Sequence, residues 1–287
     1  MLITRHAEAR AVLSDPRYVP PPVRQDGEEG TLAWLRARVS RFSTGETHAR
    51  RRGELVELLS GLDPAELRAA AREATRRATG RATGQATGQA TGQATGEPAG
   101  EPAGSASGEV SDAAAGERRG EWRGVPTAVL GAALGVPDTR AVADAAAGYL
   151  SGEESPRADA AVAELLKTAS LPVITLLLQA HAATEALIET ALGHAEPGDD
   201  IDALLCETLR QDPPLKVTRR LDAHTGDEVT IDLVAANRDP GVFPDPEVFD
   251  TTRGHAPHLT FGHGVRPCPA PAHALALAAG VLEGLLR

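Results

Sequence analysis

The chain has 287 residues, enough for one large domain or two small ones, and its 41% hydrophobic and 24% charged residues are ordinary for a globular protein. Its formal net charge of -11 argues against a nucleic-acid partner. Two cysteines, Cys206 and Cys268, form neither a disulfide framework nor a zinc-ligand spacing.

Arg, Ala, Gly and Pro dominate the composition and only Lys167 and Lys216 are lysines, a bias typical of a GC-rich bacterial genome. No N-terminal stretch has the order of basic, apolar and small residues that marks a signal peptide. No uncharged apolar run reaches the roughly 18 residues that would span a bilayer. We therefore expect a cytoplasmic protein without a membrane anchor.

The first 77 residues are predicted to be an N-terminal helical part. The segment ITRHAEARAVLS forms a short helix that ends at Asp15. After a proline-rich loop, residues 31–42 and 47–62 have the spacing of amphipathic helices. Pro64 then opens another helix, since proline is favoured in the first helical turn.

Residues 78–109 repeat a tetrapeptide whose commonest form is ATGQ. Each unit has almost nothing to bury, and glycine at every fourth position disfavours a helix by about 1 kcal/mol each. We therefore expect residues 78–120 to be a disordered low-complexity insertion. Expansion of a repeat within a tolerant surface loop is favoured over a functional spacer between two halves.

Residues 121–287 are predicted to be globular and mostly helical. Residues 170–195, the most apolar stretch, form a helix that is apolar nearly all round, which is typical of a buried helix. Further helices are expected between residue 121 and this helix, and after it at residues 200–214 and 270–286. Residues 228–233 begin as a strand, because every second residue is apolar.

A lone cysteine is usually a small buried hydrophobe, but the sequence around Cys268 favours another role. Gly262 and Gly264 allow tight turns ahead of it. A helix follows, and a thiolate at a helix N-terminus is stabilised by the helix dipole and by free N–H groups. Arg266 offers a cation to a nearby anion. Such a geometry suits a metal-bound thiolate.

The loop FGHGVRPC, residues 261–268, resembles the haem-binding loop of the cytochromes P450, except that Ala270 replaces the usual glycine. The resemblance implies haem b as cofactor, with Cys268 as the axial ligand of the iron. It also implies that Arg266 faces a haem propionate and that His263 belongs to the cofactor-binding loop.

Further motifs of the same family occur upstream in the expected order. Glu207-Thr208-Leu209-Arg210 resembles the ExxR helix motif, and residues three apart share a helix face, so Glu207 and Arg210 can pair. An isolated pair of this kind would be an ordinary surface ion pair. Residues 235–253 resemble the stretch that precedes the haem loop. The resemblance implies that Arg253 joins Glu207 and Arg210 in one structural network.

Two more positions are similar to propionate-binding residues of that family. His48 and Arg52 match its HxxxR motif, although a histidine on an arginine-rich helix would otherwise be exposed. Arg220 follows the ExxR helix at the usual place, with Arg219 as the alternative. The segment between Arg220 and Val229 is too brief for the family's usual hairpin.

The resemblance implies a mainly α fold with a small β component, like that of a cytochrome P450 truncated at both ends. The haem would lie between residues 170–192 and the loop ending at Cys268. The implied function is a haem-thiolate monooxygenase. It would act on a small apolar organic substrate in secondary metabolism and take electrons from a ferredoxin-type donor.

The chain departs from the family in the long apolar helix. Active members carry an acid followed by a threonine there, which relay protons to the reaction site. Here Ala182 and Ala183 occupy those places; shifting the register by one would make Thr184 the catalytic relay residue. A peroxide-driven reaction would bypass the relay. The alternatives are a catalytically impaired relative that stabilises a partner enzyme, and a degenerate product that folds poorly.

Overall fold

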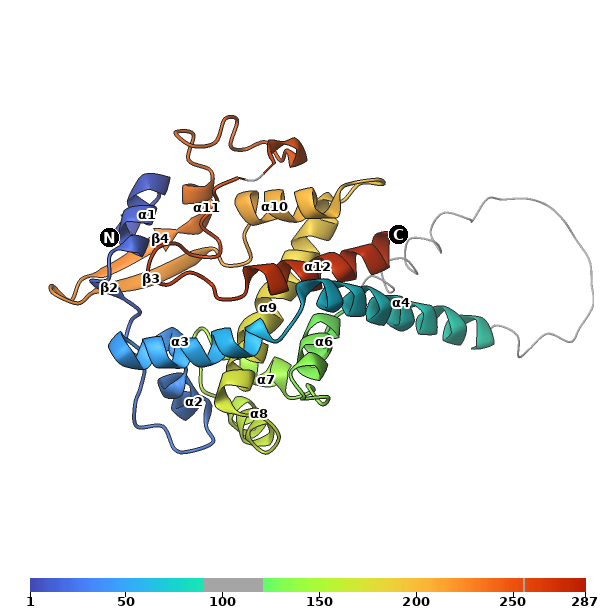
Figure 1. Cartoon of the computed structure of the whole chain (residues 1–287), viewed down its shortest axis with the longest axis horizontal. Coiled ribbons are helices and arrows are strands. Elements are labelled where there is room, and N and C mark those ends of the chain that lie inside the picture. Colours follow the sequence, from blue (N-terminus) through green and yellow to red (C-terminus); the bar gives the residue numbers. More distant parts are fainter. Residues whose placement is uncertain (90–120, 255) are drawn as a thin grey trace, which may run out of the picture.

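The computed structural model describes residues 1–89, 121–254 and 256–287, and it is mainly helical with one small sheet (Figure 1). The expected fold class is therefore confirmed. The elements in chain order are β1 (Leu2–Ile3), α1 (His6–Ser14), β2 (Tyr18–Val19), α2 (Leu32–Arg38), η1 (Ser40–Phe42), α3 (Gly45–Ser60), α4 (Pro64–Gln89), α6 (Val125–Ala133), α7 (Val142–Ala147), α8 (Pro156–Leu166), α9 (Leu171–His194), α10 (Ile201–Gln211), β3 (Val217–Asp222), β4 (Glu228–Asp232), α11 (Leu233–Asn237), η2 (Thr251–Arg253) and α12 (Pro271–Leu286).

Helix α9 runs through the middle of the molecule, and α3, α6, α7, α10 and α12 pack around it (Figure 1). Its first half is buried on every side because residues 173–178 are nearly all apolar, as the sequence predicts. By length and composition alone, α9 is the one helix in the described ranges that could cross a membrane. Its place among five packed helices accounts for the same composition.

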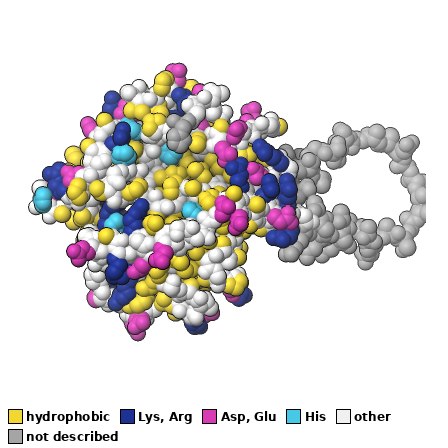
Figure 2. Space-filling model, viewed as in Figure 1, with side chains coloured by type: hydrophobic (Ala, Val, Ile, Leu, Met, Phe, Trp, Pro, Cys, Tyr) yellow, Lys and Arg dark blue, Asp and Glu magenta, His cyan; other side chains and the backbone are white. Residues whose placement is uncertain are grey.

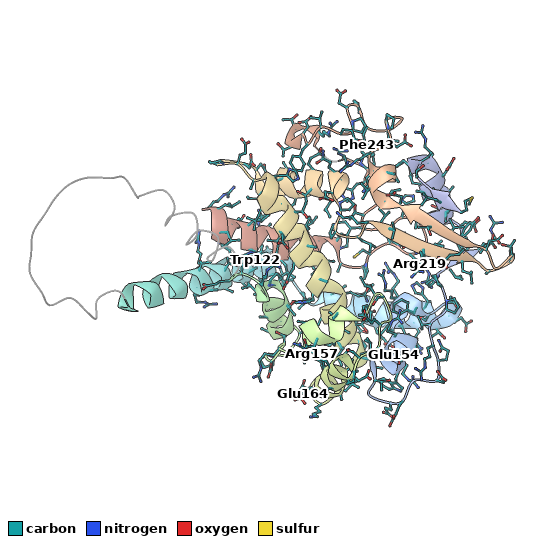
Figure 3. All side chains as sticks on the ribbon, turned by 180° about the vertical axis from the view of Figure 1, so that it is seen from behind. Trp122, Glu154, Arg157, Glu164, Arg219 and Phe243 are labelled. Atoms are coloured by element: carbon teal, nitrogen blue, oxygen red, sulfur yellow. The ribbon has the colours of Figure 1, made fainter. Side chains whose placement is uncertain are left out.

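Helix α12 packs closely along α4, so that the last helix of the chain contacts one from its first third. A Cβ atom at Gly280 would lie 2.8 Å from the Cβ of Ala71 and would collide with the Arg68 carbonyl. Glycine therefore permits this close approach. Trp122, 2% exposed, fills the core where α4, α9 and α12 meet (Figure 3).

Helix α4 does not end at residue 77, where the sequence analysis placed the boundary of the helical part, but continues to Gln89. Once a helix is nucleated, each further residue adds a hydrogen bond, and this offsets the glycine penalty over the first repeat units. The rest of the predicted insertion, residues 90–120, lies outside the described residues.

The sheet has the strand order β1-β4-β3-β2, with β1 parallel to β4 and the other pairs antiparallel. Strands β3 and β4 form a short hairpin around the segment between Arg220 and Val229, with Leu221 opposite Glu228. Its short connection is possible because the Asp222 carboxylate accepts hydrogen bonds from the backbone N–H of His224 and Thr225.

Charged side chains of both signs surround the face seen in Figure 2, and apolar side chains gather over its middle. The net negative charge of the chain is therefore not segregated on this face. A separate apolar cluster joins α1 to the sheet and to the segment before Cys268, through Leu13, Ile231 and Leu259. The N-terminal strand and helix thus support the loop that carries the cysteine.

Candidate functional site: an arginine-rich cavity beside Cys268

Glu207, Arg210 and Arg253 form the network that the motifs imply. Arg210 donates to both oxygens of the Glu207 carboxylate at 2.6 and 2.8 Å, and the two side chains are 0% and 2% exposed. Arg253 adds a longer hydrogen bond of 3.3 Å to the same carboxylate. Arg210 also donates to the carbonyls of Pro246 and Val248, which ties helix α10 to the irregular segment before η2.

Asn237 is a second link between helix α10 and the cysteine loop, and the sequence analysis did not single it out. Its side-chain N–H group donates to the carbonyl of Leu209 and the hydroxyl of Thr260, while its oxygen accepts from the backbone N–H of Leu259 at 2.7 Å. Thr260 donates in turn to the Leu209 carbonyl at 2.6 Å. These bonds fix the start of the loop.

The loop turns through two glycines that need left-handed backbone angles, Gly262 with φ +75° and Gly264 with φ +65°. A Cβ atom at Gly264 would collide with Ser14 of α1 and lie 2.7 Å from the Leu13 carbonyl. The backbone N–H of Cys268 donates to the Phe261 carbonyl at 2.6 Å, which closes the loop. The predicted tight turn is present.

Cys268 directs its sulfur toward the first turn of α12, where the backbone N–H of Ala270 donates to it at 3.4 Å. The expectation of a stabilised thiolate is only partly met. Burial raises the pKa of Cys268, and this outweighs the opposing effects of the Ala270 N–H, Arg52 and Arg41. The group is therefore a thiol until a metal ion displaces its proton.

A cavity of about 790 Å³ lies between α9 on one side and the cysteine loop on the other. Leu176, Ala180 and Ala183 of α9 line it opposite Phe261 and Cys268. The sheet and the segment after α7 close it further. Figure 3 labels Arg219, which lines the cavity from β3.

The charged groups that line the cavity are all basic. No aspartate or glutamate of the described chain is among the lining residues, whereas seven arginines are: Arg24, Arg36, Arg41, Arg52, Arg219, Arg220 and Arg266. In a chain of net charge -11, this concentration of positive charge is not a consequence of composition. It predicts an anionic occupant, because unpaired buried charges are costly.

The predicted propionate-binding residues His48, Arg52, Arg220 and Arg266 all line this cavity. Burial lowers the pKa of His48 to about 4, and Arg266 and Arg52 lower it further in the same direction. Burial also lowers the pKa of Arg266 to about 10, with smaller contributions from Arg220 and Arg52. These groups lie close enough to repel one another, so a shared anion would stabilise the cluster.

His263 is the exception among the predicted cofactor-binding residues, because the others line the cavity and it does not. It lies against Arg10 of α1, at 3.3 Å from the Arg10 Nε. The turn at Gly264 directs it to the outer side of the loop. Arg219, the alternative to Arg220, lines the cavity but is exposed and pairs with Glu228 at 3.7 Å.

Ala182, Ala183 and Thr184, the three positions that the sequence analysis considered for the relay pair, all line the cavity. The two alanines are exposed, whereas Thr184 is only 2% exposed. Since no carboxylate of the described residues lines the cavity, no acid from another element takes that place.

The sequence analysis missed four further basic lining residues: Arg24, Arg36, Arg41 and His273. Arg36 and Arg41 lie in a segment whose spacing predicts only an amphipathic helix. His273, in the first turn of α12, has its Nε2 at 3.1 Å from the Leu59 carbonyl. An excess of arginines in residues 36–52 was the available signal, but it did not show which of them face inward.

Comparison with solved structures defines the class: the chain has the cytochrome P450 fold. It resembles P450BioI in its complex with an acyl carrier protein carrying hexadec-9Z-enoic acid, with a TM-score of 0.68, 22% identity, and coverage of 99% of this chain and 84% of that one.

Two further solved structures show the same fold. CYP154C4 from Streptomyces sp. ATCC 11861 gives a TM-score of 0.64 and 19% identity, and the match covers 99% of this chain and 81% of that one. The ligand-free P450 monooxygenase TamI gives a TM-score of 0.64 and 22% identity, and the match covers 99% of this chain and 76% of TamI. No family model matches the sequence, and no curated protein matches it.

The residues of the cavity fit a haem. Cys268 offers one sulfur ligand, and the cluster of His48, Arg52, Arg220 and Arg266 offers donors to carboxylates. No group of three or more His, Cys, Asp or Glu side chains in the described ranges could hold a metal ion. A metal at Cys268 would therefore need most of its ligands from a cofactor, as haem provides.

Proposed function

We propose that the chain is a haem-thiolate protein of the cytochrome P450 family that acts as a monooxygenase. The observation that carries the proposal is a cysteine sulfur at the wall of a cavity that is lined by arginines and by no carboxylate of the described residues. Haem b is a mostly apolar macrocycle with two carboxylates, so it needs a ligand for its iron and cations for its propionates. The P450 fold of the solved neighbours supports the same conclusion.

In this proposal Cys268 ligates the iron, and His48, Arg52, Arg220 and Arg266 hold the propionates. A haem with an axial thiolate favours cleavage of the O–O bond when bound. Glu207, Arg210 and Arg253 are positioning residues, because their hydrogen bonds reach the segment that precedes the loop rather than the cavity. Gly262 and Gly264 let the loop backbone approach the cofactor.

The overall reaction inserts one atom of O₂ into a C–H bond of a small, largely apolar organic substrate and reduces the other atom to water. It consumes two electrons from a ferredoxin-type donor and two protons. Leu176, Ala180 and Leu187 supply an apolar wall and exclude water. We propose that the protein is bacterial and cytoplasmic, with a role in secondary metabolism.

The ferrous–carbon monoxide difference spectrum of the purified protein tests this function. A strongly red-shifted Soret band is expected, and Cys268→Ser should abolish it. Cys206→Ser is the matched control, since Cys206 lies on α10 outside the cavity lining and should leave the band intact. Absence of the band, or its persistence in Cys268→Ser, would refute a haem-thiolate protein.

The second candidate function is a P450-like partner that stabilises another biosynthetic enzyme. Ala182 and Ala183 favour it, because they leave no acid–threonine pair at the cavity wall. The two functions differ in turnover. A protein that shows the thiolate band but oxidises no substrate with either a ferredoxin-type donor or hydrogen peroxide would support the partner role.

A further inference from the structure

Two of the cavity arginines are separate from the proposed propionate cluster and flank one aromatic ring. The Arg36 guanidinium lies 4.6 Å and that of Arg41 6.0 Å from the centroid of the Phe42 ring. Both line the cavity, and in the described chain neither forms an ion pair with a carboxylate. Two cations without an ion-pair partner thus lie together at the wall, and the nearest carboxylate influence is that of Glu154, which raises the pKa of Arg36 against the larger effect of burial.

Arg36 is held in place by the protein backbone. Its Nε donates to the Tyr149 carbonyl at 2.9 Å, and its Nη2 is 3.5 Å from the Leu150 carbonyl. A Cβ atom at Gly152, where φ is +82°, would lie 2.8 Å from the Arg36 Cζ. The segment after α7 is therefore shaped to receive this guanidinium, which is fixed before any ligand arrives.

Tyr149 lies beside these arginines in the core and does not line the cavity. Its side chain is 0% exposed, and its ring centroid lies 5.7 Å from that of Phe42. Burial raises the pKa of Tyr149, while Arg41 and Arg36 lower it, so its hydroxyl lies near both cations. Tyr149 therefore supports the Phe42 ring against which the two guanidinium groups lie.

Other arginines of the same cavity already have partners. Arg24 donates to both oxygens of Glu154, at 3.1 and 2.9 Å, and at 2.7 Å to Asp26. Arg219 lies 3.7 Å from Glu228. Once the propionate cluster is assigned to haem, the unbalanced positive charge lies at Arg36 and Arg41.

We infer that Arg36 and Arg41 bind the carboxylate of an acidic organic substrate with an apolar body. Guanidinium groups hold carboxylates by charge-assisted hydrogen bonds, and both of these arginines line the cavity. The apolar body would lie along the α9 wall, at Ala180 and Ala183, in the direction of the cysteine loop. The inference narrows the substrate class of the proposed monooxygenase. Oxidation of the acid rests on that proposed function, whereas binding of the acid does not.

Calorimetric titration with decanoic acid, its methyl ester and decanol tests the inference, because the three probes differ mainly in the acid group. The acid is expected to bind at least about tenfold more tightly than the other two. Arg36→Gln should weaken binding of the acid by about ten- to a hundredfold and leave the ester unchanged.

Arg24→Gln is the matched control, since it removes the same charge from a residue that already has carboxylate partners; acid binding should not change. Arg41→Gln is the second variant in case Arg36→Gln folds poorly, because the Arg41 guanidinium makes no hydrogen bond to the described residues. Equal binding of acid, ester and alcohol, or an acid preference that survives both variants, would overturn the inference.

The ferrous–carbon monoxide spectrum of the same samples separates this inference from the proposed function. Acid binding that depends on Arg36 in a protein without the red-shifted band would refute the haem-thiolate function and retain the acid site. A protein with the band that binds the ester as tightly as the acid would refute the acid site alone.

Discussion

Arg210 holds the Glu207 carboxylate by two parallel hydrogen bonds of 2.6 and 2.8 Å, and both side chains are almost completely buried. Removing one partner of a buried pair leaves an uncompensated charge, which costs about 3–5 kcal/mol. Arg210→Met should therefore lower the free energy of unfolding by about that amount in urea titrations. Glu189→Gln, which breaks the exposed pair with Arg123, should cost less than about 1 kcal/mol. Similar losses in the two variants would contradict this account.

The Gly264 turn is expected to tolerate no side chain. Gly264→Ala adds a Cβ that collides with α1, at a backbone angle that alanine rarely adopts. We expect a loss of about 1–3 kcal/mol in stability and a weaker carbon monoxide band. Gly193→Ala in helix α9 is the control, since nothing lies within 4 Å of an added Cβ there. That variant should be neutral or slightly more stable.

His48 predicts the pH dependence of the haem-free protein. Its pKa falls from 6.5 to about 4 on folding, so between these values the unfolded chain binds more protons than the folded one. The free energy of unfolding should therefore decrease as the pH falls from 6.5 toward 4. His48→Gln should flatten this part of the profile, as measured by urea unfolding at several pH values. An unchanged slope would show that other groups control it.

The proton relay can be tested by restoring it. Ala182→Glu with Ala183→Thr introduces the acid and hydroxyl into side chains that already face the cavity. In the proposed enzyme, donor-driven turnover should rise about tenfold or more relative to peroxide-driven turnover, because only the former needs delivered protons. Ala182→Gln with Ala183→Val is the matched control of similar shape. An equal rise in that control would mean that cavity shape, not proton transfer, was responsible.

The propionate cluster predicts haem affinity. Arg52→Gln removes a guanidinium that lines the cavity and lowers the pKa of Arg266 and His48. Loss of a charge-assisted bond should weaken haem binding by about tenfold or more, as measured by transfer of haem to apomyoglobin. Arg50→Gln, on the outer side of the same helix and paired with Glu54, should change it little. Equal haem loss in both variants would exclude a direct role for Arg52.

The sequence by itself determined the features that depend on neighbouring residues. Helix geometry puts residues three apart on one face, so the Glu207–Arg210 pair followed from its spacing. The apolar pattern of residues 170–195 predicted the buried helix α9, and the glycines before Cys268 predicted a tight loop. These predictions succeeded because local backbone geometry leaves few alternatives.

Only the tertiary structure decided which side chains of distant segments meet. Arg36 reaches the Tyr149 carbonyl across 113 residues of sequence, and no local pattern encodes that contact. His263 lies two residues after Phe261 in the same loop, yet the turn at Gly264 directs it to α1 and away from the cavity. The short β3–β4 connection depends on hydrogen bonds to the Asp222 side chain, which no apolar pattern encodes. Motif spacing thus located the cysteine loop, while the packing of α2, α7 and α9 decided where the remaining positive charge of the cavity lies.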